Sequence, residues 1–234
     1  MRALFVAHDH VSPTGPLAQR LREHGFEVDE ILIVDEANFA TPNVAFEFPD
    51  LARYDLIVPM GSPWGAWDDE SIGRWLLPEI AWVREAIDRD IPVLGVCFGG
   101  QLMARALGGT VARAPRAEIG WTAIHTDDAA LVPAGPWFQF HYDRWTLPDA
   151  ATEVARNASA SQAFTVGRSL AVQFHPELTA SMLEGWLREG GAEQVEADGQ
   201  DAAAMLAHTR SEEASAVQRA NALVDAFLRR AGLL

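Results

Sequence analysis

The only cysteine of this 234-residue chain lies in the sequence Gly95-Val-Cys97-Phe-Gly99, directly after the apolar run 91–96. Glycines two residues before and after a nucleophile permit the sharp, strained turn from a strand into a helix that exposes a reactive side chain. A lone cysteine is more often a small buried hydrophobic residue, but the glycine frame favours chemistry here. The pattern predicts that Cys97 is a thiol nucleophile and that a base lies near it in space.

The best candidates for that base and its partner follow a second short apolar strand, in the sequence Gln173-Phe-His175-Pro-Glu177. Alternate side chains share a face in an extended segment, so His175 and Glu177 can point the same way. The imidazole would take the thiol proton, and the carboxylate would orient the ring and stabilise the imidazolium. An adjacent imidazolium and a helix N-terminus both favour the thiolate. Taken alone, each of these two residues would be an ordinary core or surface residue.

Together these segments resemble the class I glutamine amidotransferases, the family that includes the amidotransferase domain of GMP synthetase. The matching segments are 95–101, 107–109 and 173–177, in the family's order of Cys, His and Glu. The resemblance covers roughly residues 1–190 and is closest to free-standing GMP-synthetase-like members. It implies that Cys97 attacks the side-chain amide of glutamine, releases ammonia and leaves a γ-glutamyl thioester for water to hydrolyse.

The resemblance also implies an oxyanion hole. The sequence Gly61-Ser62-Pro63 stands where the family commonly has Gly-Gly-Pro. By family analogy one donor is the backbone N–H at this position, and the other is the N–H of Phe98. Ser62 carries a Cβ that limits the peptide flip available to glycine, so we expect a half-formed hole and a poor glutaminase until a partner binds. The alternative is a plain turn rich in Gly and Pro.

Two further residues are expected to contact the substrate. Gln101 lies on the first turns of the helix after Cys97 and matches a family glutamine that helps to bind glutamine, although it could instead be a helix surface residue. Tyr142, in the sequence His-Tyr-Asp, resembles the centre of a family loop whose backbone contacts the amino-acid end of glutamine. We therefore assign Gln101 and Tyr142 to substrate binding.

Composition limits the remaining function classes. The net charge is −15, all 18 basic residues are arginines, and there is no lysine for a Schiff base or a phosphate loop. The acidic balance disfavours binding to nucleic acid or to an anionic membrane. One cysteine permits no internal disulfide, and no apolar stretch approaches the roughly 20 residues that span a bilayer. We expect a soluble cytoplasmic enzyme that needs no metal or organic cofactor.

Hydrophobic periodicity alternates between strands and helices. Strands are predicted at 2–7, 26–34, 56–60 and 93–96, with helices at 16–24, 72–89 and 100–107. This is the pattern of an α/β protein with a doubly wound, mostly parallel sheet, the flavodoxin-like fold that the resemblance also implies. Shorter strands over 110–173 predict a small antiparallel layer.

The C-terminal part changes character. Residues 190–201 read as a polar linker, and 202–209 and 212–230 as two helices. The second of these has an apolar face, which would pack on the sheet or, alternatively, bind a partner. We therefore predict an amidotransferase domain at 1–190 and a helical extension of the same domain at 191–234.

Three functions remain open. The first is a glutamine amidotransferase-type hydrolase that supplies ammonia to a separate synthase. The second is a hydrolase of γ-glutamyl amides or peptides with no ammonia acceptor, which would differ in the pocket for the leaving amine. The third is a weakly active subunit whose role is to bind a synthase.

Overall fold

Parallel strands form the half of the sheet on which the candidate residues lie. The computed structural model describes all residues, 1–234. One set of parallel strands has the order β2 (Glu27–Leu32), β1 (Arg2–Ala7) and β3 (Leu56–Pro59), and β4 (Leu94–Val96) pairs in parallel with β10 (Ser169–Val172). A parallel bridge between Ile57 and Val93 joins the two sets. The carboxyl ends of β1, β3, β4 and β10 consequently share one edge.

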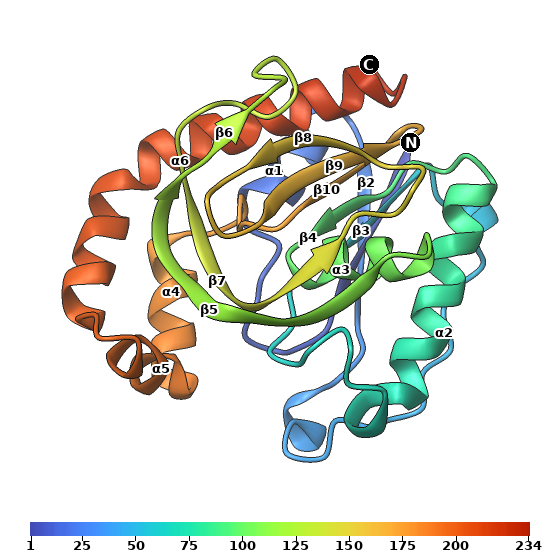
Figure 1. Ribbon diagram of the computed structural model, residues 1–234. Coiled ribbons are helices and arrows are strands. Elements are labelled where there is room, and N and C mark those ends of the chain that lie inside the picture. The colour runs from blue at the N-terminus through green and yellow to red at the C-terminus, as the bar shows by residue number, and fades with distance from the viewer.

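Antiparallel strands extend this sheet beyond β10. They follow in the order β9 (Ser161–Val166), β8 (Thr152–Arg156) and β6 (His125–Thr126). A separate ribbon pairs β5 (Thr110–Ala123) with β7 (Pro136–Thr146), and it lies in front of the main sheet in Figure 1. The antiparallel layer that the sequence predicts is therefore present in two parts.

Helices cover both faces of the sheet, as the doubly wound pattern requires. They are α1 (Gly15–Glu23), α2 (Asp69–Asp88), α3 (Phe98–Ala106), α4 (Ala180–Trp186), α5 (Ala192–Ala197) and α6 (Ala202–Arg230), with short 3-10 turns at Glu36–Asn38 and Leu51–Arg53 and a kinked π segment at Leu187–Gly191. Phe5 on one face of β1 packs in the cluster of Leu21 and Phe227, from α1 and α6. Leu4 on the other face packs in the cluster of Trp75, from α2. None of the helices has the combination of length and hydropathy that a membrane-spanning segment needs.

The C-terminal helices differ from the sequence prediction. The expected linker is largely helical, since α5 follows the kinked segment in which Gly190 has a φ of 95°. The two helices expected at 202–209 and 212–230 are one helix, α6, of 29 residues. No glycine or proline interrupts residues 202–230. In addition, Thr209 donates its hydroxyl to the Met205 carbonyl and accepts the Trp121 indole N–H, which supports the helix where we expected a break.

The apolar face of α6 docks on the sheet, as the sequence favoured. Leu223, Val224, Phe227 and Leu228 are all buried in the core cluster that also holds β1 and α1. In Figure 1, α6 runs along the left and upper side of the sheet, opposite α2. The helix therefore belongs to the same core as the parallel strands.

Replacing Phe227 by alanine should destabilise the whole protein. The side chain is fully buried, and loss of a buried phenylalanine typically costs about 3–5 kcal/mol of unfolding free energy. Urea unfolding followed by tryptophan fluorescence and by circular dichroism measures the change. Leu234→Ala, at a side chain that is 54% exposed, is the matched control and should change stability by no more than about 0.5 kcal/mol. A separate early transition for Phe227→Ala would contradict the shared core.

Candidate active site

Cys97 occupies a strained turn between β4 and α3. Its φ of 50° and ψ of −105° lie in a region that residues with a side chain rarely adopt. Its N–H donates to the Val172 carbonyl at 2.8 Å, and the N–H of Gly99 donates to the Met60 carbonyl at 3.0 Å. A Cβ at Gly99 would collide with the Pro59 carbonyl, and one at Gly95 would lie 2.6 Å from the Gly99 carbonyl oxygen. The flanking glycines thus let this turn pack between two neighbouring strands.

His175 and Glu177 form a buried pair beside this turn. His175 Nδ1 lies 2.7 Å from Glu177 Oε1, and both side chains are almost fully buried. They follow β10, which pairs in parallel with β4, so they reach the same sheet edge as Cys97. Burial alone would lower the pKa of His175, but the adjacent Cys97 and Glu177 raise it well above its ordinary value. The other ring nitrogen, Nε2, has no hydrogen-bond partner of standard geometry. It is the nitrogen available to the neighbouring Cys97 thiol.

Two glutamine side chains connect the thiol to the ribbon. Gln173 Nε2 donates to Cys97 Sγ at 3.7 Å, and Gln101 Nε2 donates to Gln173 Oε1 at 3.3 Å. The Gln101 amide also lies 3.5 Å from the Asp143 carbonyl oxygen. Gln101 is therefore buried in the site and is not a helix surface residue. Gln173 is not among the site residues predicted from the sequence, although its spacing of two from His175 places both side chains on one face of an extended segment.

The loop after β3 brings Gly61 and Ser62 to the site. A Cβ at Gly61 would lie 3.2 Å from His175 Cε1, so the absence of a side chain lets the loop pack against the imidazole. Ser62 has no positive φ, which means that its Cβ costs no backbone strain. Its hydroxyl accepts the Trp64 N–H at 3.2 Å. Phe98 is the first residue of α3, so its N–H has no partner within the helix.

A pocket opens above Cys97 between these loops and the ribbon. Its walls include Gly61, Ser62, Cys97, Phe98, Gln101, Tyr142 and His175, so all of the predicted site residues except Glu177 line it. Glu177 lies behind His175. Tyr142 donates its hydroxyl to Gln194 at 3.1 Å, and its ring lies 5.4 Å from the guanidinium of Arg113.

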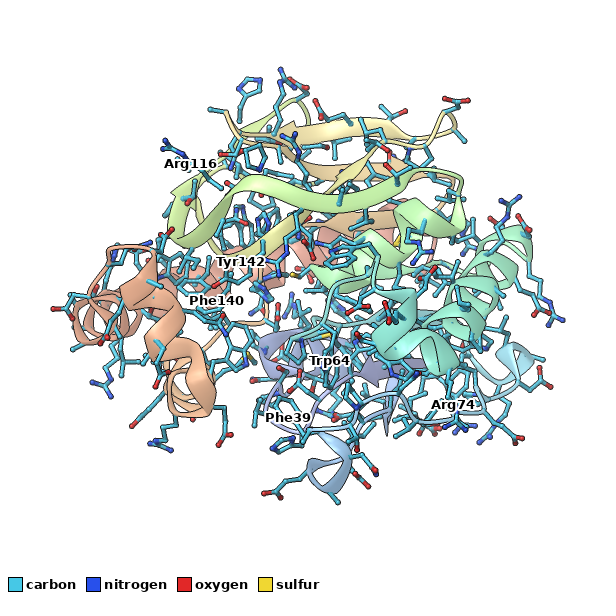
Figure 2. All side chains as sticks on the ribbon, turned by 60° about the horizontal axis from the view of Figure 1, so that its bottom comes forward. Phe39, Trp64, Arg74, Arg116, Phe140 and Tyr142 are labelled. Carbon is cyan, nitrogen blue, oxygen red and sulfur yellow. The ribbon has the colours of Figure 1, made fainter.

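Aromatic side chains form much of the wall. They are Phe39, Trp64, Trp67, Phe98, Phe140, Tyr142 and Trp186. Figure 2 shows Phe140 and Tyr142, from β7, on one side, and Trp64 and Phe39, from the loops after β3 and β2, on the other. The Trp186 ring lies 5.0 Å from the His175 ring and closes that end. A wall of this kind can hold an apolar or aromatic group as well as a small amide.

Charged groups of both signs line the same pocket. Arg113 is the one arginine in the lining, and Asp9, Asp143 and Glu189 supply carboxyl groups. Burial raises the pKa of Asp9, against hydrogen bonds from Val11 and Ser12, and burial likewise raises the pKa of Asp143. A guanidinium and carboxylates side by side can bind the two ends of an amino acid. No group of three or more His, Cys, Asp or Glu side chains is arranged to hold a metal ion.

Comparison with known proteins gives consistent relatives. A family model described as glutamine amidotransferase class-I matches residues 70–188, slightly more than half of the chain. GMP synthase [glutamine-hydrolyzing] of Nitrobacter hamburgensis is 29% identical over 207 residues, which cover 76% of this chain and 37% of that protein. A glutamine amidotransferase-like protein of Penicillium rubens is 41% identical over 106 residues, covering 44% of this chain and 41% of its own length. The chain spans about a third of the length of the GMP synthases it matches.

Solved structures point to the same family as the sequence matches. A glutamine amidotransferase of Thermotoga maritima superposes with a TM-score of 0.82 at 27% identity, covering 99% of this chain and 98% of that one. A glutamine amidotransferase of Methylobacillus flagellatus gives a TM-score of 0.84 at 21% identity, over 98% and 94% of the two chains, and supports the fold alone. The protein has the flavodoxin-like fold of these enzymes, and it belongs to the class I glutamine amidotransferase family.

Proposed function

We propose that this protein hydrolyses the side-chain amide of glutamine through Cys97, His175 and Glu177. The observation that carries the proposal is the strained turn at Cys97 beside a buried His175–Glu177 pair, at the base of a pocket that can hold an amino acid. The resting site would hold a thiolate and an imidazolium. Glu177 stabilises that imidazolium through Nδ1 and orients the ring.

In the proposed reaction the thiolate of Cys97 attacks the amide carbon of glutamine and forms a new C–S bond. The amide oxygen takes the negative charge and is stabilised by the N–H groups of Ser62 and Phe98. His175 donates its proton to the leaving nitrogen as the C–N bond breaks, which releases ammonia and leaves a γ-glutamyl thioester. Water then gives a proton to His175 and attacks the thioester, yielding glutamate and the regenerated thiolate.

The amino-acid end of the substrate would be bound by the charged groups of the pocket. Arg113 suits the α-carboxylate, and Asp143 suits the α-ammonium. Two further side chains border this region. Gln101 is held between Gln173 and Asp143, and Tyr142 lies next to Asp143 on β7. Residues 1–190 would carry the chemistry, and 191–234 would form a helical extension of the same domain.

The ammonia would be used by a synthase active site outside these residues. The relatives named glutamine-hydrolysing GMP synthase extend well beyond the matched region, and this chain corresponds to about a third of their length. Such a synthase would bind at the pocket edge and could raise the glutaminase rate. The soluble, cytoplasmic setting expected from the sequence belongs to the same proposal.

A second candidate function is hydrolysis of an N-substituted γ-glutamyl amide. The aromatic residues of the pocket favour it, because ammonia as a leaving group needs no apolar wall. The covalent chemistry would be the same, with an amine leaving in place of ammonia.

Substitution of Cys97 by alanine should abolish turnover and preserve folding. Removal of a nucleophile from a triad typically costs about 10⁴-fold or more in kcat. Glutamate release from glutamine and the midpoint of thermal unfolding are the two measurements. The proposal fails if the folded alanine variant keeps more than about a tenth of the wild-type turnover.

The pKa of His175 should lie above the ordinary histidine value, and the Cys97→Ala and Glu177→Gln variants should each lower it. The reason is that both partners favour the imidazolium, against burial. NMR titration of the labelled imidazole measures the value directly. A wild-type pKa at or below about 6.5 would contradict the resting ion pair.

A γ-glutamyl anilide should separate the two candidate substrates. If the aromatic wall binds a leaving group, Trp64→Ala should lower kcat/KM for the anilide about 10- to 100-fold, which corresponds to loss of one buried aromatic contact. The same variant should change kcat/KM for glutamine by less than about threefold. Equal losses for both substrates would show that Trp64 does not select the leaving group, and no anilide hydrolysis by the wild type would favour the amidotransferase.

A further inference from the structure

A second histidine–glutamate pair lies behind the loop of Gly61 and Ser62. His8 follows β1, Glu79 lies in the middle of α2, and both side chains are fully buried. His8 Nδ1 lies 2.9 Å from the Gly61 carbonyl oxygen, and His8 Nε2 lies 3.1 Å from each of the two Glu79 carboxylate oxygens. His8 does not line the pocket, and the chemistry above does not use it.

The hydrogen-bond partners of His8 determine its protonation. A carbonyl oxygen can only accept, so Nδ1 must carry a proton and donate it to Gly61. Nε2 faces both carboxylate oxygens, which suits a second N–H shared between them. Burial alone would lower the pKa of His8, but Glu79, the Gly61 carbonyl and Asp9 together raise it. These contacts favour an imidazolium that donates from both nitrogens.

This hydrogen bond fixes the direction of one peptide group. The peptide between Gly61 and Ser62 is planar and trans, so its C=O and its N–H point in opposite directions. The C=O points to His8, behind the loop. The Ser62 N–H must then point away from His8, toward the pocket side on which Cys97 and His175 lie.

His8 also packs against the side chain of Phe98, the residue whose N–H is the second candidate oxyanion donor. Its ring packs edge-on against the Phe98 ring, with centroids 4.6 Å apart. The carbonyl of Met60, the residue before Gly61, accepts the N–H of Gly99, which follows Phe98 at the start of α3. His8 thus meets both residues beside the proposed hole, Gly61 through a backbone hydrogen bond and Phe98 through its side chain.

We propose that the buried His8–Glu79 pair is a positioning element that holds the Gly61–Ser62 peptide with its N–H directed at the oxyanion of the reaction. The inference rests on the proposed function, since it assigns a role at the same site. The pair makes the hole preformed in this chain, so that Ser62 in place of glycine does not leave it half-formed. His8 contacts no reacting atom and acts only through Gly61.

A variant that folds without the pair can separate a positioning role from a purely stabilising one. Replacing a buried ion pair by apolar residues of similar volume is often neutral or stabilising, because both charges no longer need to be desolvated. The aromatic surroundings of His8, Trp75 and Phe98, suit a phenylalanine ring. The double variant His8→Phe with Glu79→Leu should therefore fold and lack only the donor to Gly61.

The experiment compares this double variant with a rescue variant and a control. The rescue variant, His8→Asn with Glu79→Gln, keeps an amide N–H near the position of Nδ1. The control, His24→Phe, removes a histidine–aspartate contact elsewhere, between His24, which directly follows α1, and Asp225 of α6. For each protein we would measure kcat and KM, the inhibition constant of the γ-aldehyde analogue of glutamine, and the iodoacetamide alkylation rate of Cys97.

The double variant His8→Phe with Glu79→Leu lacks the donor to Gly61, and we call it the donor-free variant. It should lose about 10²- to 10³-fold in kcat, the typical effect of one oxyanion donor. The alkylation rate should stay within about threefold because alkylation forms no oxyanion, and KM should do so because acylation and deacylation both pass through an oxyanion and slow together. The aldehyde, which adds to the thiol to give a tetrahedral mimic, should bind more weakly by a similar factor. The rescue variant should recover at least a tenth of wild-type kcat, and His24→Phe should keep all of it.

Two results would overturn the proposal. One is a folded donor-free variant with kcat within about threefold of wild type. The other is equal loss of kcat in the donor-free and rescue variants, together with a changed KM and alkylation rate, which would indicate a general structural role. A wild-type protein that hydrolyses neither glutamine nor any γ-glutamyl amide would instead overturn the proposed function, and the positioning role with it.

Discussion

The positive φ of Cys97 is the constraint on which the rest of the site depends. Such a conformation costs of order 1–3 kcal/mol and persists only where the surroundings over-determine it. Here the N–H of Cys97 is bonded to β10, and the N–H of Gly99 to the residue after β3. Both strands must be in register with β4 before the turn can form. The thiol is therefore positioned by the sheet and not by its own loop.

The parallel pairing of the strands also brings the other site residues together. Residues that follow parallel strands emerge at one edge, and the ends of β1, β3, β4 and β10 supply His8, Gly61, Cys97 and His175. The ribbon of β5 and β7 then covers this edge and adds the polar and aromatic wall. A crevice outside the carboxyl ends of the strands is where doubly wound sheets bind ligands.

Two of the buried histidine–glutamate pairs differ in how their ring nitrogens are occupied. In the His175–Glu177 pair, one ring nitrogen is bonded to the carboxylate and the other has no hydrogen-bond partner of standard geometry. In the His8–Glu79 pair, both nitrogens are already occupied by acceptors. A histidine with a free nitrogen can exchange a proton with a substrate, whereas one with two acceptors can only hold its neighbours in place. Neither pair is a strong source of stability, because both charges are desolvated.

The sequence by itself determined the alternation of strands and helices, the turn at Cys97 and the pairing of His175 with Glu177, because these depend on local spacing and periodicity. Only the tertiary structure decided the rest. The hydrogen bond that supports α6 at the expected break comes from Trp121, 88 residues away. The contacts of Gln101, and the pairing of His8 with Glu79 across 71 residues, form only when the sheet brings distant segments together. No local pattern encodes them, since a buried polar side chain shows its role only through the partner it meets.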